Sequence, residues 1–290
     1  MSKQVLIFTD SSADLTKDYA DNNQIFVMPF AININNREYL DGVDISTKEL
    51  FEYVDKTKKL PKTAARSIED MKELVKLHRD NEQDIVWISI SSRLSVNGKN
   101  AENALKELGG EESGLYYVDS KGLSGGIALL IEQAVQMRDG GKSAAEIAVD
   151  LRKKAEGLQV SFVVENLEFL HKGGRCTGAQ AFFAGILKIR PTIRLIDGLM
   201  TVGRKYKVNS YEKIVAKYIE DTLATCPDYV DDKCYLTHCY ASEEALKIAK
   251  ETILANSTFK EIVVSDAGST ISTHCGKGTL GLLYLTKSKQ

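Results

Sequence analysis

The first half of the chain alternates between apolar runs and amphipathic segments, and this alternation narrows the possible folds more than any other feature. The run at residues 85–90 is apolar throughout, as expected for a strand buried on both faces of a parallel sheet. The rhythm predicts an α/β domain with a mostly parallel sheet. Strands are expected at residues 5–9, 25–30, 85–90 and 115–118, and helices at 47–56, 67–80, 122–138 and 143–156.

The pattern changes near residue 158, where strands and helices no longer alternate regularly. Asp197-Gly198 lies between two short apolar runs and predicts a tight hairpin, as Asn35-Asn36 does earlier in the chain. A second domain of the α+β class is therefore expected. With 290 residues the chain is long enough for two domains, which we place at residues 1–157 and 158–290.

Composition excludes several classes of protein. The net charge of −2 argues against a protein that binds nucleic acid through phosphate contacts. The longest apolar stretch, residues 181–187, is far shorter than the roughly 20 residues that span a bilayer. No signal-peptide pattern precedes the first strand, so a cytoplasmic location is expected. The 5 cysteines lack CxxC spacing, which suggests neither a disulfide framework nor a zinc ribbon.

A charged, glycine-rich turn at residues 170–178 precedes a segment, 179–189, that is apolar on nearly every side. This pattern predicts a buried helix with Thr177 as its N-cap and Pro191 at its end. Arg175 would then lie beside a helix N-terminus, a position that favours an anion. A fixed cation at the mouth of an apolar interior suits an amphiphile with an acidic head. An ordinary core helix with a solvated arginine explains the same residues equally well.

Polar residues gather after several predicted strands, where open α/β sheets place their ligand sites. Residues 10–14 contain two aspartates, which we interpret as an Asx turn and a helix cap in preference to a metal site. Thr63 follows Lys62 in an expected loop at residues 60–66. The serines at residues 91–98 could receive a carboxylate or phosphate, although a simple capping role for Ser95 accounts for them as well.

Residues 268–278 form the last polar stretch and include His274, which lies between small residues. It could carry a proton or pair with a carboxylate. A Ser95–His274 pair is formally compatible with a hydrolase or transferase, but the chain has no G-x-S-x-G nucleophile elbow. Neither a glycine fingerprint for nucleotides nor a histidine pair with metal spacing is present.

Short motifs lie along the chain in a fixed order. They are Asp10-Ser11-Ser12-Ala13-Asp14-Leu15, Thr63, Ser91-Ser92-x-Leu94-Ser95, Val118-Asp119-Ser120, Leu167-Glu168-x-Leu170-x-Lys172-Gly173-Gly174-Arg175 and Thr273-His274-x-Gly276-x-Gly278. Together these motifs resemble the DegV family, the bacterial fatty-acid-binding proteins that serve fatty acid kinase. The resemblance covers almost the whole chain, and its most specific part is the Leu-Glu-x-Leu-x-Lys-Gly-Gly-Arg run that ends at Arg175.

The resemblance implies a long-chain fatty acid held between an N-terminal α/β domain and a C-terminal α+β domain. Thr63 and Ser95 would hydrogen-bond its carboxylate, while Arg175 and His274 would lie near the head group and serve phosphoryl transfer by a partner kinase. The protein would not itself be an enzyme. Its partners would be the fatty acid and a fatty acid kinase subunit that makes acyl phosphate for phospholipid synthesis. Transient contact with a membrane surface is compatible with this role; nucleic acid, a metal or a cofactor is not expected.

The chain departs from the usual family pattern at several positions. These are Ala64-Ala65-Arg66 after Thr63, Val96-Asn97-Gly98-Lys99 after Ser95, Lys277 between the last two motif glycines, and Lys207 in place of an arginine. Arginine and lysine are not equivalent at a phosphate or docking site. Two alternatives therefore stay open: a serine-dependent acyl hydrolase or transferase, and a binder of another amphiphile that is not coupled to a kinase.

Overall fold

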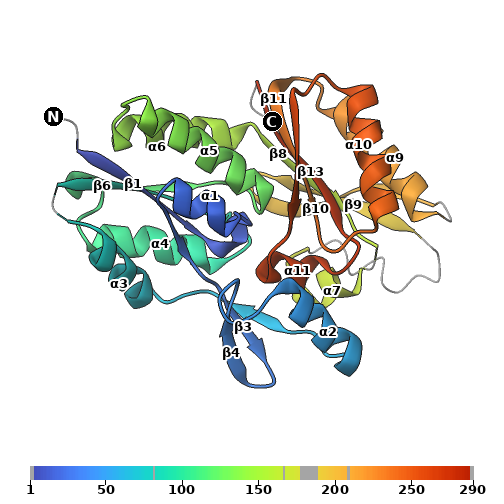
Figure 1. The fold of residues 1–290 in the computed structure, drawn as a ribbon, viewed down its shortest axis with the longest axis horizontal. Helices are drawn as coiled ribbons and strands as arrows, with labels where there is room; N and C mark the ends of the chain where they lie inside the picture. The colour runs from blue at the N-terminus through green and yellow to red at the C-terminus, as the bar shows by residue number, and fades with distance from the viewer. Residues whose placement is uncertain (1–2, 81, 166, 177–188, 208–209, 288–290) are drawn as a thin grey trace.

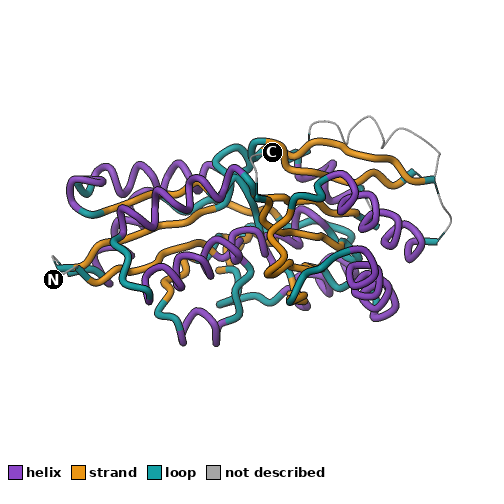
Figure 2. The backbone as a smooth tube through the Cα atoms, turned by 90° about the horizontal axis from the view of Figure 1, so that it is seen from above, coloured by secondary structure: helices purple, strands orange, loops and turns teal. Residues whose placement is uncertain are grey.

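The described part of the chain folds around three β-sheets. The computed structural model describes residues 3–80, 82–165, 167–176, 189–207 and 210–287. We call residues 3–157 the N-terminal half and residues 158–287 the C-terminal half. Figure 1 shows one sheet in each half with helices packed around it, and the small third sheet below the N-terminal half. Seen from above in Figure 2, the molecule is elongated along the line that joins the two halves.

The four-stranded sheet of the N-terminal half is entirely parallel, in the order β2-β1-β6-β7. Alternate residues of β1 enter different cores, since Leu6 and Phe8 face one cluster while Val5 and Ile7 face another. Both faces are therefore buried, as the sequence predicted. The strands are β1 (Gln4–Asp10), β2 (Ile25–Met28), β6 (Gln83–Ser89) and β7 (Leu115–Asp119); the helices that cover them are α3 (Ile68–His78), α4 (Val96–Glu107), α5 (Gly125–Asp139) and α6 (Ala144–Glu156).

The C-terminal half is built on a six-stranded sheet in the order β10-β9-β8-β13-β11-β12. The β11–β12 pair is parallel and the other pairs are antiparallel, which confirms the α+β class. Helices α9 and α10 pack on one face, while α5 contacts the other. The elements are β8 (Leu158–Val163), β9 (Arg190–Ile196), β10 (Leu199–Tyr206), α9 (Tyr211–Thr225), β11 (Tyr229–His238), α10 (Glu243–Asn256), β12 (Glu261–Asp266) and β13 (Leu280–Thr286). The boundary at residue 157 stays a prediction.

The third sheet corrects one expectation. β3 (Ala31–Ile34) pairs with β4 (Arg37–Leu40) through the predicted turn, in which Asn35 and Asn36 have φ of 50° and 61°. Residues 60–66 were expected to be a loop, and this was wrong, because β5 (Lys62–Ala64) pairs with the free edge of β3 and sets Ile32 opposite Thr63. A strand of three residues is too short to show a period of two, so β3 determines its conformation.

The remaining short elements connect the sheets. They are the 3₁₀ helices Ser11–Ala13 and Gly110–Ser113 and the helices α1 (Lys17–Asn22), α2 (Thr47–Thr57), α7 (Glu168–Gly173) and α11 (Ser269–Cys275). A turn was expected at residues 170–178, but residues 170–173 belong to helix α7. The turn begins at Gly174, the C-cap of this helix, which has φ of 68°. The helix expected at residues 179–189, with Thr177 as its cap, lies outside the described residues except at its end. The Asp197-Gly198 hairpin is confirmed. Ser67 and Ser242 cap the N-termini of α3 and α10.

Helix α11 is held by two carboxylates of the N-terminal half. Asp41 is buried and accepts hydrogen bonds from Ser269 N at 3.0 Å, Thr270 N at 3.2 Å and Ser11 Oγ at 2.9 Å. Asp14 accepts from Gly268 N at 2.8 Å and from Ser124 Oγ. These bonds satisfy backbone N–H groups that a helix N-terminus leaves unpaired. The two halves are thus joined by hydrogen bonds at the start of α11.

Replacing Asp41 with alanine should lower the free energy of unfolding by about 2–4 kcal/mol, because two backbone N–H groups at a buried helix end lose their acceptor. Urea unfolding followed by circular dichroism measures the change. Asp55→Asn is the matched control. Asp55 is exposed and forms a surface ion pair with Lys277 at 3.8 Å, and such pairs contribute little to stability. Equal stability of both variants would show that Asp41 does not hold α11.

Candidate functional site

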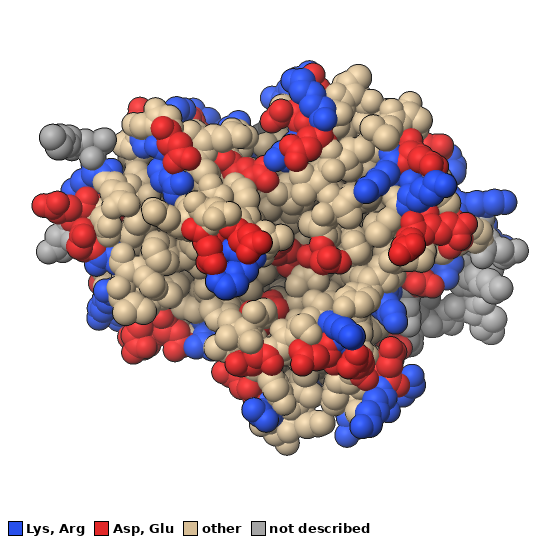
Figure 3. Space-filling view, in the orientation of Figure 1, with Lys and Arg blue, Asp and Glu red and all other residues tan. Residues whose placement is uncertain are grey.

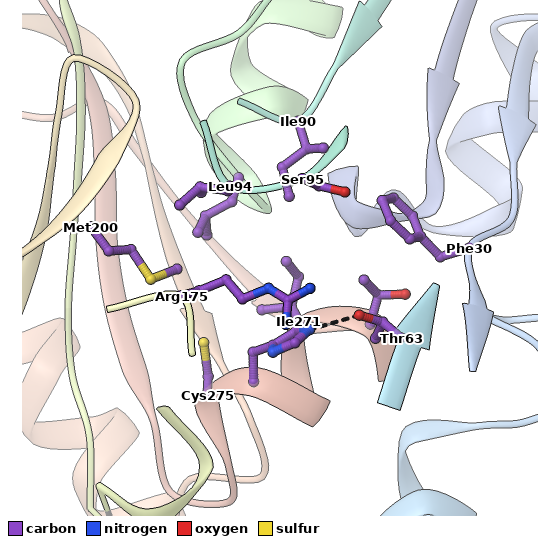
Figure 4. A pocket seen from close by; sticks show the side chains of 12 residues that line it. Phe30, Thr63, Ile90, Leu94, Ser95, Arg175, Met200, Ile271 and Cys275 are labelled. Atoms are coloured by element: carbon purple, nitrogen blue, oxygen red, sulfur yellow. Dashed lines mark hydrogen bonds between the residues drawn. The ribbon is translucent and has the colours of Figure 1, made fainter. Parts of the chain in front are cut away.

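A cavity lies between the two halves and is lined by residues from both (Figure 4). It encloses about 430 Å³ of empty space, including its opening to solvent. Most of its wall is apolar, while hydroxyl groups, an imidazole and a guanidinium supply the polar part. The lining residues are Phe30, Thr63, Ile90, Leu94, Ser95 and Leu123 from the N-terminal half and Arg175, Met200, Thr270, Ile271, His274 and Cys275 from the C-terminal half. All four candidate site residues therefore meet here.

Thr63 and His274 form a hydrogen bond across the cavity. Thr63 Oγ1 on β5 lies 2.8 Å from Nε2 of His274 on α11, and the two residues are 211 positions apart in the chain. The ring is closely confined, because a Cβ added to Gly173 would lie 2.7 Å from His274 Nδ1. Strand β5 and helix α7 thus fix the imidazole from two sides.

The environment of His274 keeps its imidazole neutral. Burial removes the hydration that would stabilise a charged ring, and the nearby positive charge of Arg175 adds to this effect; together they lower the pKa to about 4. At neutral pH the imidazole is therefore a neutral hydrogen-bonding group in this structure, and the positive charge near the cavity comes from Arg175.

Ser95 has a capping role and also faces the cavity. Its Oγ accepts a hydrogen bond from Asn97 N at 3.2 Å at the start of α4, which confirms the simple capping interpretation. Because Oγ uses an acceptor position for the cap, its hydroxyl hydrogen can still be donated to a ligand. Asn97 is itself buried and fixed, since its side chain accepts from Arg66 N at 3.0 Å and donates to Asp10 Oδ2 at 3.3 Å.

Asp10 organises the turns around Ser95 from within the N-terminal half. Its carboxylate also accepts hydrogen bonds from Ser12, from Ser89 Oγ and from Ile90 N. Burial raises its pKa, and these hydrogen bonds oppose that effect. The structural interpretation of residues 10–14 is confirmed. Within the ranges that the structure describes, no group of His, Cys, Asp and Glu side chains is arranged to hold a metal ion.

Arg175 follows α7 and is exposed at the cavity mouth. Its Nη1 donates to the carbonyl of Gly173 at 2.6 Å, which holds the side chain against the same turn that confines His274. Figure 4 shows the Arg175 side chain extending toward Ile271 and Thr63. The helix whose N-terminus was expected to support Arg175 lies outside the described residues.

A second cavity adjoins the first and is almost wholly apolar. It contains about 300 Å³ of empty space, including its opening to solvent, between β8, β13, α11 and the residues just before α5, and it shares Leu123, Ile271 and Cys275 with the first cavity. Sequence reasoning did not identify this wall, because apolar side chains that face a cavity are chemically the same as those of a core. In the first cavity, by contrast, Phe30 and Ile90 lie just after β2 and β6, and parallel sheets place ligands at such strand ends.

Comparison with known proteins identifies the family. The model of a family described as "Uncharacterised protein, DegV family" matches residues 4–287. The chain belongs to the DegV family. A DegV domain-containing protein of Staphylococcus aureus is 27% identical over 290 residues, covering 99% of this chain and 100% of the relative. One from Clostridium acetobutylicum is 28% identical over 295 residues, covering 98% and 99%.

Solved DegV structures share the fold over its full length. The fatty-acid-binding DegV protein of Thermus thermophilus superposes with a TM-score of 0.87 at 25% identity, covering 98% of this chain and 99% of that one. DegV of Bacillus subtilis, described as a fatty acid binding protein, gives 0.84 at 23%, covering 99% and 100%. A DegV protein of Eubacterium eligens loaded with heptadecanoic acid gives 0.82 at 20%, covering 98% and 100%. These scores confirm the DegV-like α/β fold.

His274 should titrate with a pKa of about 4 in the folded protein, well below that of an unfolded histidine near 6.5. Between these values only the unfolded chain takes up the proton, so His274 destabilises the fold as pH falls from 6.5 toward 4. Histidine NMR spectra across this range, assigned with His274→Asn, measure the pKa. Arg175→Gln should raise it, and Arg152→Gln on α6 should not. A midpoint near 6.5, or no response to Arg175→Gln, would contradict the assignment.

Proposed function

We propose that this protein binds a long-chain fatty acid between its two halves and presents the carboxylate to a separate fatty acid kinase. The observation that carries the proposal is the convergence of two hydroxyl groups, from Thr63 on β5 and Ser95 at the start of α4, on the polar side of a mostly apolar cavity. Arg175 supplies a positive charge at the same place.

The acyl chain provides most of the binding free energy. At about 0.8 kcal/mol per buried CH₂, a C16 chain gains roughly 12 kcal/mol in gross terms when it leaves water. The two adjoining cavities offer apolar walls from Leu123, α11 and β13 for this chain. Binding itself costs several kcal/mol of lost freedom, so the apolar contribution has to be large.

The carboxylate opposes burial, and the polar groups offset this cost. Removing an ion from water is unfavourable unless the ion is hydrogen-bonded or paired. In the tautomer with the proton on Nε2, His274 donates to Thr63 Oγ1, which leaves the threonine hydroxyl hydrogen for the ligand. Ser95 is placed in the same way by Asn97 N. Two hydroxyl donors and the guanidinium of Arg175 would then hold the carboxylate at the cavity mouth.

Relatives support this ligand class. The Thermus thermophilus protein, which shares the fold and 25% of its residues with this chain, is a fatty acid binding protein. Other DegV structures have been solved with vaccenic or heptadecanoic acid, which are long-chain fatty acids. Binding rather than catalysis is the proposed role, with the fatty acid as ligand and no resident cofactor.

The geometry favours binding over a serine hydrolase. Nucleophilic catalysis needs a base within hydrogen-bond reach of the serine hydroxyl. His274 Nε2 instead pairs with Thr63, and Ser95 Oγ accepts from a backbone N–H. The chemistry is therefore assigned to the partner: a carboxylate oxygen attacks the terminal phosphorus of ATP on the kinase, which gives acyl phosphate and ADP. Use of the product in phospholipid synthesis, membrane contact and a cytoplasmic location remain predictions.

Loss of either hydroxyl should weaken fatty acid binding. Thr63→Val and Ser95→Ala each remove a hydrogen bond to a charged group, which is worth about 1.5–3 kcal/mol, or roughly 10- to 100-fold in Kd. Calorimetric titration with palmitate measures the effect. Ser92→Ala is the matched control from the same turn, because the Ser92 hydroxyl bonds to Asp119 outside the cavity. Unchanged affinity in both site variants would overturn the proposed carboxylate position.

Arg175→Ala and His274→Ala should reduce acyl phosphate formation by the cognate kinase more than they reduce palmitate binding. The reason is that both groups lie where the carboxylate meets solvent, and the acyl chain provides most of the affinity. Phosphorylation rates at saturating fatty acid, compared with the Kd of each variant, separate the two effects. Equal rates for wild type and both variants would contradict this assignment.

A further inference from the structure

A second, polar hollow opens on the outer side of His274. It is lined by Leu60, Pro61, Thr63, Gly173, Thr273 and His274 together with Lys58, Lys59, Lys62, Lys172 and Arg175. We call the last five residues the lysine basin. Thr63, Arg175 and His274 also line the first cavity, so the basin begins where the proposed carboxylate site ends.

The positive charge of the basin is poorly compensated. No acidic side chain lines it among the residues that the structure describes. Within the same residues, no acidic side chain forms an ion pair with Lys58, Lys59 or Lys62; only Lys172 has such a partner, Glu168 at 2.6 Å. Other lysines of the chain are matched by carboxylates, for example Lys142 with Asp150 at 2.6 Å. A cluster of like charges in a hollow is unfavourable by itself and attracts an anion.

Helix capping explains in part why a lysine stands at position 58, but it does not explain Lys59 or Lys62. Lys58 is the C-cap of α2, where the helix dipole favours a cation. Lys59 lies beyond the helix and Lys62 is the first residue of β5, and both lysines are exposed. The segment 59–62 therefore brings its positive charges to the same edge of the site as Thr63.

We propose that the lysine basin binds a phosphate dianion next to the head group of the bound lipid. This inference rests on the proposed function. A group joined to the carboxylate oxygen has to extend away from the apolar cavity, and the basin is the polar space that Thr63 and His274 separate from it. The phosphate belongs either to the acyl phosphate product or to the polyphosphate of the donor nucleotide. Ammonium groups on flexible side chains suit both, since lysine binds phosphate as a point charge.

The test compares two lipids that differ in the head group. Palmitate probes the carboxylate site alone. 2-Oxoheptadecylphosphonate is a stable acyl phosphate analogue in which CH₂ replaces the bridging oxygen, so its phosphonate should enter the basin. Lys59→Gln/Lys62→Gln should weaken the phosphonate about tenfold, a loss reduced by added salt, and palmitate less than about twofold. Lys247→Gln/Lys250→Gln on α10 is the matched control and should change neither affinity.

Inorganic triphosphate, titrated into the palmitate-loaded protein, distinguishes the two phosphate sources. If the basin variant weakens triphosphate but not the phosphonate lipid, the phosphate is that of the nucleotide. If the variant binds both phosphate probes as wild type does, the proposal is overturned. Weaker association with the kinase in that case would make the basin a protein-docking surface. If wild type fails to bind palmitate, the proposed function fails, and triphosphate titrated into the protein without lipid still decides whether the basin binds phosphate.

Discussion

The structure depends on the way in which two carboxylates of the N-terminal half hold the start of α11. Asp14 and Asp41 lie in loops after β1 and β4, yet they accept hydrogen bonds from Gly268, Ser269 and Thr270. Buried backbone N–H groups need such acceptors, so the helix cannot shift without losing several bonds at once. His274 is near the other end of α11, and its position opposite Thr63 follows from this attachment. The site is thus assembled by contacts between the halves.

Electrostatics divides the region around α11 into three zones. The second cavity is almost wholly apolar, the first has a few hydrogen-bonding groups, and the lysine basin carries positive charge that acidic side chains of the described residues only partly neutralise. The neutral imidazole of His274 lies at the boundary, where the pKa is lowered to about 4. This order matches an amphiphile with an apolar tail and an anionic head. On the face shown in Figure 3, by contrast, acidic and basic side chains are interspersed over both halves.

Local signals in the sequence predicted much of the fold, because they depend on neighbouring residues. Asn35-Asn36 and Asp197-Gly198 form the expected hairpin turns, in which Asp197 has φ of 47°. Strand β5 and helix α11 were not predicted, because each is short and is held by partners far away in the chain. In the described part of the chain, no helix combines the length and apolar character needed for a membrane span, in line with the short apolar runs of the sequence.

The site residues came from the family resemblance rather than from periodicity. Thr63, Ser95, Arg175 and His274 are weak signals singly, and their common position in one cavity requires the three-dimensional fold. Asp41 gave no signal, since it bonds to residues more than 200 positions away. The apolar wall was missed for a different reason. Leu123, Ile271 and Cys275 are chemically the same as core residues, and only the packing shows that they face a cavity.

The central claim is that the space between the halves holds a long-chain fatty acid. Mass spectrometry of the lipid extracted from the purified protein, without added lipid, tests it most directly, with native mass spectrometry to give the stoichiometry. The account predicts one free fatty acid per chain, which is lost or sharply reduced in the Thr63→Val/Ser95→Ala double variant. Absence of lipid, or a different acidic amphiphile in its place, would contradict the ligand assignment while leaving the DegV fold intact.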